Sequence, residues 1–290
     1  MLLLIGILIV ILWAAGTFKS LSSLLGLEDF SLTAEQYPFA MHVLDVGKAD
    51  AILLECDGHF MLVDGGTVDQ GRPVRQYLTR RGVTQLDYVV NTHPDKDHIG
   101  GLATVLEHIP VSHFLTSVLP EGKAPDSKEY QATMETVEKR HIAQQTVSAG
   151  DTFPLGPAYV EVLAPITVAD DTNNNSIVMR VTFGKTVFLL TGDAEEPEEI
   201  SLLKSGTDLS ADVLKVGHHG SNTSTSQQFL EAVSPSYAAI SVGKDSNELP
   251  KKKILKRLES AGAAIFRTDL NGTILFGSDG HTIQVHLEKP

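Results

Sequence analysis

The sequence predicts an α/β protein in which two β-sheets pack face to face and helices cover the outside. Pairs of apolar runs flank short turn sequences, which is typical of antiparallel hairpins. These runs are apolar on both faces, which indicates strands buried on two sides. Helical stretches separate the hairpins. A doubly wound parallel sheet would need strand and helix to alternate throughout, and the hairpins exclude it.

The first 36 residues differ from the rest of the chain. Residues 2–18 are uncharged and almost wholly apolar, and as a helix they would reach about 25 Å. They predict a signal peptide, cleaved before Thr17, or a single transmembrane anchor, although no Lys or Arg precedes them. Residues 19–36 are mixed and Ser-rich and predict a linker. The expected protein is membrane-anchored or secreted, with residues 37–290 as a soluble extracytoplasmic domain.

Turn sequences set the predicted hairpins. Asp57-Gly58 and Gly184-Lys185 each separate two apolar runs, and Asn271-Gly272 with Asp279-Gly280 predicts a three-strand meander near the C-terminus. The predicted helices cover residues 73–81, 102–108, 128–140, 195–204, 226–233 and 251–261. Shorter strands that end in loops are predicted at 88–91, 213–216 and 238–242.

Composition narrows the function. The chain has 290 residues, 42% of them hydrophobic, and a net charge of −13. The apolar fraction excludes a disordered protein, and the negative charge argues against a broad nucleic-acid-coating surface. It leaves room for a local phosphate site, because bound cations reverse the sign of a carboxylate-lined pocket. The single Cys56 excludes an intramolecular disulfide and a thiolate-rich zinc cluster, so histidines and carboxylates would have to hold any metal.

Metal-ligand types gather at three predicted strand ends. His93, Asp95, Asp97 and His98 follow an apolar strand and precede Gly100-Gly101. Asp193 follows the apolar run that ends at Leu190, and Lys215 begins a segment that continues to His218, His219 and Gly220. We expect these three strand ends to converge on one edge of the sandwich. Asp50 and Asp64 are interpreted as supporting or turn residues rather than ligands.

The motifs HPDKDHIGG, TGD and HHGS, in this order, resemble the metallo-β-lactamase superfamily of hydrolases. The segments HVLDVGKADAILLE, NNNSIVMRVTFGKTVFLLTGDAE and RTDLNGTI further resemble the branch that contains the C-terminal domain of the competence protein ComEC. The similarity covers about residues 39–277. It implies an αββα four-layer sandwich, preceded here by the N-terminal apolar helix, with a dinuclear site at one edge.

The resemblance also implies roles for individual residues. One metal would be bound by His93 and Asp95, the other by Asp97, His98 and His218, and Asp193 would bridge them. His219 would face the substrate as proton donor or phosphate contact, which makes His219 and Asp97 the catalytic candidates. Asp95 stands where the family usually has His, and residues 173–176 (Asn-Asn-Asn-Ser) stand where it often adds another. Such oxygen-rich ligands shift the preference from Zn²⁺ towards Mn²⁺ or Mg²⁺. The resemblance implies two divalent ions, which we expect to be zinc or manganese.

Two such cations can lower the pKa of bound water to about 7 and stabilise attacking and leaving oxygens. The predicted function is therefore a phosphodiesterase or nuclease that uses a metal-bound hydroxide and is related to DNA uptake. Ser221, Asn222, Thr223 and Lys48 are the predicted substrate contacts. Lys48-Ala49 and Leu249 replace the branch's usual Gln-Gly and His, which leaves substrate details open. The expected partners are a phosphodiester, a membrane bound through the N-terminal helix, and a DNA-uptake complex.

Two alternatives stay open. The same centre could hydrolyse a lactone, a thioester or a choline-phosphate ester, which the acidic net charge favours because DNA is repelled outside the immediate site. A non-catalytic scaffold of an envelope or uptake complex is the other alternative, and the missing histidine near Asn175 is its only support.

Overall fold

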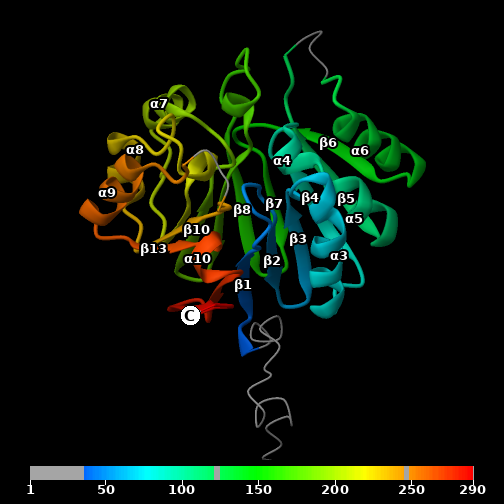
Figure 1. Ribbon diagram of the computed structural model, residues 1–290, viewed down its shortest axis with the longest axis horizontal. Coiled ribbons are helices and arrows are strands. Elements are labelled where there is room, and N and C mark those ends of the chain that lie inside the picture. Colours follow the sequence, from blue (N-terminus) through cyan, green and yellow to red (C-terminus); the bar gives the residue numbers. More distant parts are fainter. Residues whose placement is uncertain (1–35, 121–124, 245–247, 290) are drawn as a thin grey trace, which may run out of the picture.

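Two β-sheets packed face to face form the centre of the protein, with helices on both outer faces (Figure 1). The computed structural model describes residues 36–120, 125–244 and 248–289. The predicted N-terminal helix, with its roles as signal peptide or anchor, lies outside the described residues, as does the linker except for Gln36. No helix among the described residues has the length and apolarity that a membrane crossing requires.

One sheet has eight strands and the other has seven. In spatial order the first contains β15 (Ile283–Leu287), β14 (Ile274–Ser278), β1 (Phe39–Val43), β2 (Ile52–Cys56), β3 (His59–Val63), β4 (Leu86–Asn91), β5 (Val111–Ser117) and β6 (Ala143–Val147). The second contains β13 (Ala264–Arg267), β12 (Tyr237–Ile240), β11 (Val213–Lys215), β10 (Thr186–Leu190), β9 (Val178–Phe183), β8 (Ala158–Ala164) and β7 (Thr152–Leu155).

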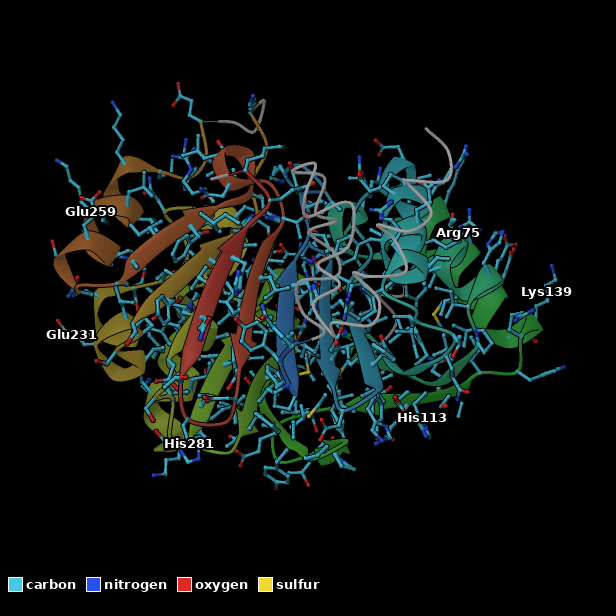
Figure 2. The ribbon with its side chains drawn as sticks, turned by 90° about the horizontal axis from the view of Figure 1, so that it is seen from below. Arg75, His113, Lys139, Glu231, Glu259 and His281 are labelled. Atoms are coloured by element: carbon cyan, nitrogen blue, oxygen red, sulfur yellow. The ribbon has the colours of Figure 1, made fainter. Side chains whose placement is uncertain are left out.

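Helices cover each sheet on the side away from the other sheet. The longer ones are α3 (Gly71–Arg80), α5 (Leu102–His108), α6 (Lys128–Lys139), α7 (Glu196–Ser205), α8 (Gln227–Val233) and α9 (Lys252–Ser260). The short ones are α4 (Lys96–Ile99), α10 (Thr268–Asn271) and the 3-10 turns η2 (Val68–Gln70), η3 (Asn173–Asn175) and η4 (Gly217–Gly220). Figure 2 shows the charged side chains of Lys139, Glu231 and Glu259 on the outside of the helical layers.

Three apolar clusters separate the four layers. The central one lies between the sheets and includes Phe39, Phe188 and Phe276. A second packs α3, α5 and α6 on the eight-stranded sheet, and a third packs α7, α8 and α9 on the seven-stranded sheet. Strands that face two apolar layers must be apolar on both sides, which is the pattern that the sequence displays. The predicted two-sheet α/β sandwich is confirmed.

The two internal hairpins form at the predicted turns. In the β2–β3 hairpin Asp57 and Gly58 both have positive φ, 46° and 83°, as a tight two-residue turn requires. The β9–β10 hairpin pairs Phe183 with Thr186 around Gly184. Each predicted helix is present with its ends shifted by at most two residues.

The predicted C-terminal meander is wrong. β14 and β15 form a hairpin in the eight-stranded sheet, but β13 pairs in parallel with β12 in the other sheet. The chain crosses between sheets through α10, where the Thr268 hydroxyl accepts a hydrogen bond from the Val242 amide at 2.8 Å. Phe266 of β13 packs against Tyr237 and Phe276 between the sheets. This packing favours the crossing over a local third strand.

Candidate metal centre

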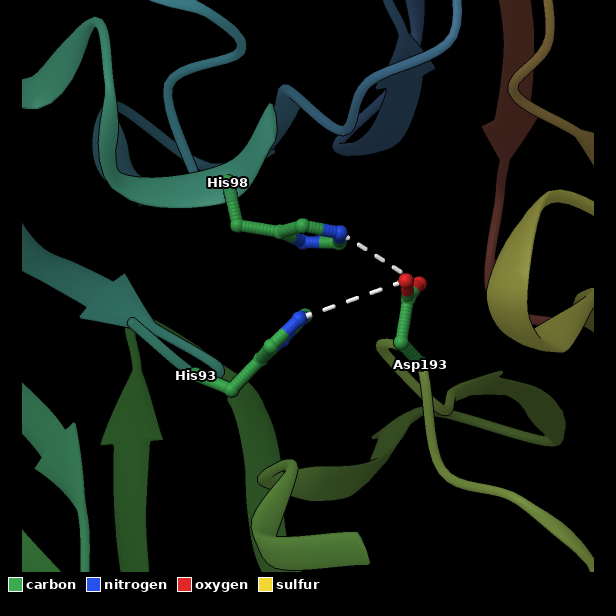
Figure 3. Close-up of side chains that lie close together, drawn as sticks. All are labelled: His93, His98 and Asp193. Atoms are coloured by element: carbon green, nitrogen blue, oxygen red, sulfur yellow. Dashed lines mark ion pairs between the residues drawn. The ribbon is translucent and has the colours of Figure 1, made fainter. Parts of the chain in front are cut away.

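The ends of β4, β10 and β11 bring the predicted motifs together at one edge of the sandwich. His93 follows β4, Asp193 follows β10 and His218 follows β11, which runs parallel to β10. The Asp193 carboxylate lies at the centre: its Oδ1 is 3.3 Å from His98 Nε2, and its Oδ2 is 4.0 Å from His93 Nε2 (Figure 3). The convergence inferred from the sequence is therefore present.

His219 completes the inner ring of side chains. Its Nε2 lies 3.6 Å from Asp193 Oδ2 and 3.6 Å from Asp97 Oδ2. Ligand atoms fall into three overlapping groups, each within 4.8 Å: His93, His98 and Asp193; Asp97, His98 and His219; Asp50, Asp64 and His98. The first group contains Asp193, and the second shares His98 with it, so candidate ligand atoms for a cation gather around this carboxylate.

Contacts behind the imidazoles fix which nitrogen faces the centre. His98 Nδ1 lies 2.8 Å from Asp64 Oδ2, and His219 Nδ1 lies 2.9 Å from the Ser241 carbonyl oxygen. Each Nδ1–H donates to its oxygen partner, which leaves Nε2 directed inward. Such outer contacts orient histidine ligands in metalloproteins. Asp64 thus has the supporting role that its sequence position predicted.

His93 is held in the same way by hydroxyl groups. Its Nδ1 lies 3.1 Å from Thr92 Oγ1 and 3.3 Å from Ser176 Oγ. The Ser176 hydroxyl also accepts a hydrogen bond from the Asp193 amide, so one small side chain connects the first ligand loop to the central carboxylate.

The atoms that face the centre are suited to bind a cation. His93, His98 and His219 are fully buried, yet their Nε2 atoms, and Asp193 Oδ1, have no hydrogen-bond partner among the described residues. An unpaired buried polar group is costly, and a cluster of them indicates a ligand that would satisfy them. Imidazole nitrogens and carboxylates suit divalent zinc or manganese.

The electrostatics of the cluster show a demand for positive charge beside Asp193. Burial raises the pKa of Asp193, but the nearby His98 and His219 imidazoles hold it well below the ordinary aspartate value. Burial opposes a charge on His98, while Asp193 and Asp64 raise its pKa well above the ordinary histidine value. The central carboxylate is therefore ionised at neutral pH, and its field favours positive charge at the place where a cation would sit.

The adjacent His218 lies at the rim rather than in the inner ring. Its Nε2 is 3.8 Å from Asp193 Oδ2, its Nδ1 is 3.0 Å from Glu195 Oε1, and its side chain is 23% exposed. The resemblance implies that His218 joins Asp97 and His98, whereas His219 is the histidine whose ligand atom groups with theirs in the structure. The reason is local: both histidines have positive φ, 46° and 53°, and this tight turn directs His219 inward.

Asp95 lies beside His93 and is only half-buried. Its Oδ2 is 4.0 Å from His93 Nε2, its Oδ1 accepts a hydrogen bond from Thr172 Oγ1 at 2.7 Å, and its side chain is 43% exposed. The Asn residues of η3 do not replace the missing histidine. Asn174 and Asn175 bind backbone and Asp171 instead, and so shape the loop that carries Ser176.

The predicted substrate contacts line the outer part of the centre. Lys48 Nζ lies 2.8 Å from Asp97 Oδ2. Thr223 Oγ1 is 3.2 Å from His218 Nδ1 and 3.0 Å from Ser221 Oγ, while Asn222 is exposed beside them. These side chains place a cation and hydroxyl and amide donors next to the ring of ligands.

Sequence reasoning missed three supporting residues. Thr172 binds Asp95, Glu195 binds His218, and the Ser241 carbonyl binds His219. Glu195 follows Asp193 by two positions, which places it near the same edge and is a signal that could have been used. The other two approach from distant parts of the chain, and no local pattern marks them.

Two packed sheets with buried histidines and aspartates at one edge define the class of metallo-β-lactamase-fold proteins. The sequence matches the metallo-beta-lactamase superfamily over residues 44–244. The chain belongs to this superfamily.

Its relatives include competence proteins, which confirms the resemblance to the ComEC type. The chain is 31% identical over 254 residues to ComE operon protein 3 of Bacillus subtilis, covering 81% of this chain and 32% of that protein. It is 35% identical over 243 residues to competence protein ComA of Neisseria gonorrhoeae, covering 82% and 32%. The chain thus spans about a third of the length of these relatives.

Solved structures show the same fold. YhfI of Bacillus subtilis, a metallo-beta-lactamase fold protein, has a TM-score of 0.54 at 12% identity, covering 86% of this chain and all of that one. CmlA of Streptomyces venezuelae, a diiron beta-hydroxylase, has a TM-score of 0.55 at 12% identity, covering 83% and 54%. At such identities the likeness concerns the fold alone.

Proposed function

We propose that the protein is a metal-dependent phosphodiesterase that acts on nucleic acid. The observation that carries this proposal is a set of inward atoms that have no hydrogen bond within the described part of the chain, namely three histidine Nε2 atoms around the buried Asp193 carboxylate. We assign His93 and Asp95 to one cation, Asp97, His98 and His219 to the other, and Asp193 to both. Bound divalent cations would supply the Lewis acidity that activates water and neutralises charge on a phosphoryl oxygen.

The protein's own groups position the substrate. Lys48, held by Asp97, presents a cation beside the centre, and the hydroxyls of Ser221 and Thr223 donate to phosphate oxygens. His218, at the rim, is held by Glu195 and lies where a proton could be given to a leaving oxygen. Phosphate esters need such charge-neutralising donors more than carboxylic esters do, which supports the phosphodiester assignment.

The test is hydrolysis by the purified protein loaded with Mn²⁺ or Zn²⁺. We expect cleavage of bis(p-nitrophenyl) phosphate and of DNA, abolished in Asp193→Ala and Asp97→Ala. Asp126→Ala is the matched control, because it removes an exposed carboxylate to which we assign no role in the centre, and it should stay active. If the wild type leaves both substrates intact with either metal, the proposal is wrong.

A second candidate keeps the centre and changes the substrate to a lactone, thioester or choline-phosphate ester. The net charge of −13 favours it, because a long polyanion is repelled away from the immediate site. The same purified protein, tested on these esters, distinguishes the two. The protein would instead be a scaffold if the wild type takes up no metal and the Asp193→Ala variant still binds its partners.

The relatives' names support a role in DNA uptake. We infer that the chain works beside a DNA-uptake complex, with this domain outside the cytoplasm and tied to the membrane by residues 2–18. Loss of the chain would then lower uptake of labelled DNA by intact cells, and the protein would be found in the membrane fraction. Unchanged uptake would contradict this role.

A further inference from the structure

A polar cavity lies beside the metal centre, on the far side of the loop that follows His219. Its volume is about 270 Å³. The residues that line it and matter here are Asn222, Thr223, Ser226, Lys253, Arg257 and Glu196. Thr223 belongs to both places, because its Oγ1 also lies 3.2 Å from His218 Nδ1. One threonine thus separates the cavity from the rim of the centre.

Helix α9 is fixed along this loop at two points. The Lys251 amide, just before the helix, donates to the carbonyl oxygen of Gly220 at 2.9 Å, directly after His219. Near the end of the helix, Arg257 Nη1 donates to the Thr225 carbonyl oxygen. These contacts tie the helix to the loop that carries His219, and Lys253 and Arg257 of this helix line the cavity.

The cationic side chains of α9 are divided between two faces. Lys253 and Arg257, four residues apart, lie on one face and line the cavity. Lys252 and Lys256, also four apart, are exposed and do not line it. Ile254 and Leu258 are buried in the apolar cluster and hold the helix in this rotation.

The charge of the lining is unusual for this protein. Five of the 23 Lys and Arg residues lie within residues 251–257, in a chain of net charge −13. Among the described residues no hydrogen bond or ion pair engages Lys253 Nζ. The cavity also holds one exposed carboxylate, Glu196, against the two cations. The balance is positive, and the neutral donors of Asn222, Thr223 and Ser226 complete a lining suited to phosphate oxygens.

We propose that this cavity binds a second phosphate of the same strand whose scissile phosphate lies at the metal centre. This inference rests on the proposed phosphodiesterase function and narrows its substrate to a polynucleotide. A small diester reaches only the centre, whereas a strand also reaches Lys253 and Arg257. Because the overall charge repels a polyanion, this local contact supplies attraction that the rest of the surface does not.

The test compares two charge-removing pairs on one helix in the full chain. Lys253→Gln/Arg257→Gln removes the cations that line the cavity, and Lys252→Gln/Lys256→Gln removes the same charge from residues that do not line it. For a fluorescein-labelled single-stranded oligonucleotide we expect the first pair to lower kcat/KM at least about tenfold, the loss typical of charge-assisted contacts. The second pair should lower it far less. Hydrolysis of bis(p-nitrophenyl) phosphate should be unchanged in both.

The single variant Lys253→Gln controls for a loss of folding, since it leaves the contact between Arg257 and the Thr225 carbonyl oxygen in place. It should still weaken oligonucleotide cleavage and flatten the dependence of log Kd on log salt by about 0.7, the value for one phosphate contact on a single strand. Equal losses from both pairs, or no loss from the first, would overturn the inference.

Failure of the proposed function is separate from failure of this site. If the wild type cleaves neither substrate, fluorescence anisotropy of the same oligonucleotide in EDTA decides. Weaker binding in the Lys253→Gln/Arg257→Gln variant alone would support the cavity. Equal binding by all variants would refute it.

Discussion

Lys215 Nζ lies 2.8 Å from Asp50 Oδ2, and this ion pair is buried directly behind the metal centre. The Lys215 side chain is 0% exposed, and its ammonium also donates to the Val216 carbonyl oxygen at 3.0 Å. Asp50 Oδ1 lies 3.7 Å from His219 Nδ1, and burial, which would raise the pKa of Asp50, is outweighed by Lys215, which lowers it. The pair therefore joins the loop after β1 to the strand that precedes His219.

Removal of one partner from this pair should destabilise the protein. Lys215→Met leaves the Asp50 carboxylate buried without its cation, and breaking a buried pair costs about 3–5 kcal/mol. Urea denaturation measures this change in the free energy of unfolding. Lys185→Met is the matched control, because Lys185 is exposed, and it should change stability by about 0.5 kcal/mol or less. A similar loss in both variants would contradict the assigned role.

Lys215 also shows where sequence reasoning ends. Its place at the end of a short apolar strand does not reveal that the side chain is buried, because its partner Asp50 is far away in the sequence. Local signals such as the Asp57-Gly58 turn need no distant partner, so the hairpins and helices could be predicted.

The same distinction explains the candidate site. Ligand types at strand ends are visible in the sequence, and the structure brings His93, His98 and Asp193 together as the strand ends indicated. Which of His218 and His219 points inward depends on two consecutive positive φ angles. The residue types at these positions do not predict such angles. The predicted sheet of β13 is wrong for a related reason. Phe266 of this strand packs against an aromatic ring that is distant in the sequence, and a local pattern does not reveal such a contact.

Metal content should depend on the central carboxylates. We expect about two equivalents per chain after loading with Mn²⁺ or Zn²⁺. Asp193→Ala should lose most of both, because we assign this carboxylate to both cations, and Asp97→Ala should lose about one. Mass spectrometry of the dialysed protein measures this.

Asp126→Ala serves as the control for these variants and should retain the wild-type content, since its side chain is exposed. Circular dichroism checks that the variants are folded. A wild type that takes up neither metal would contradict the assignment of the cluster.

Gly101 is expected to be essential for the geometry of the first ligand loop. A Cβ there would overlap the carbonyl oxygen of Gly65, while the Gly101 amide donates to the Gly66 carbonyl at 2.9 Å. The Gly65 amide donates to His98 O at 2.7 Å, so any shift separates Asp64 from the imidazole that it orients. Gly101→Ala should cost about 1–3 kcal/mol, as overpacking does.

Gly101→Ala should also weaken metal binding, which calorimetric titration with Mn²⁺ would measure. Ala103→Ser, a small change two residues further along at the start of α5, is the comparison and should alter neither stability nor affinity appreciably. Normal metal affinity in Gly101→Ala would show that the loops tolerate the shift.

Stability should fall on acidification through a buried network of Glu55, Arg81 and His42. Arg81 Nη2 lies 2.7 Å from both carboxylate oxygens of Glu55, and His42 Nε2 lies 3.5 Å from Glu55 Oε2. Burial opposes the charge on Glu55, but the nearby His42 imidazole and the hydrogen bonds from Arg81 bring its pKa below the ordinary 4.5. Its ionisation thus stabilises the fold above about pH 4.5, and this contribution is lost as the pH falls through the folded-state pKa.

The difference in unfolding free energy between wild type and Glu55→Gln should therefore be largest near neutral pH and should shrink below about pH 4.5. His42, whose pKa burial lowers, adds a loss in the same direction, beginning as the pH falls below 6.5. Urea titrations at several pH values measure both effects. Glu161→Gln, which removes a surface partner of Arg180 at 3.3 Å, should show a small difference, below about 1 kcal/mol, at neutral pH. If the difference in unfolding free energy between wild type and Glu55→Gln grows on acidification, the pKa of Glu55 is not lowered by folding.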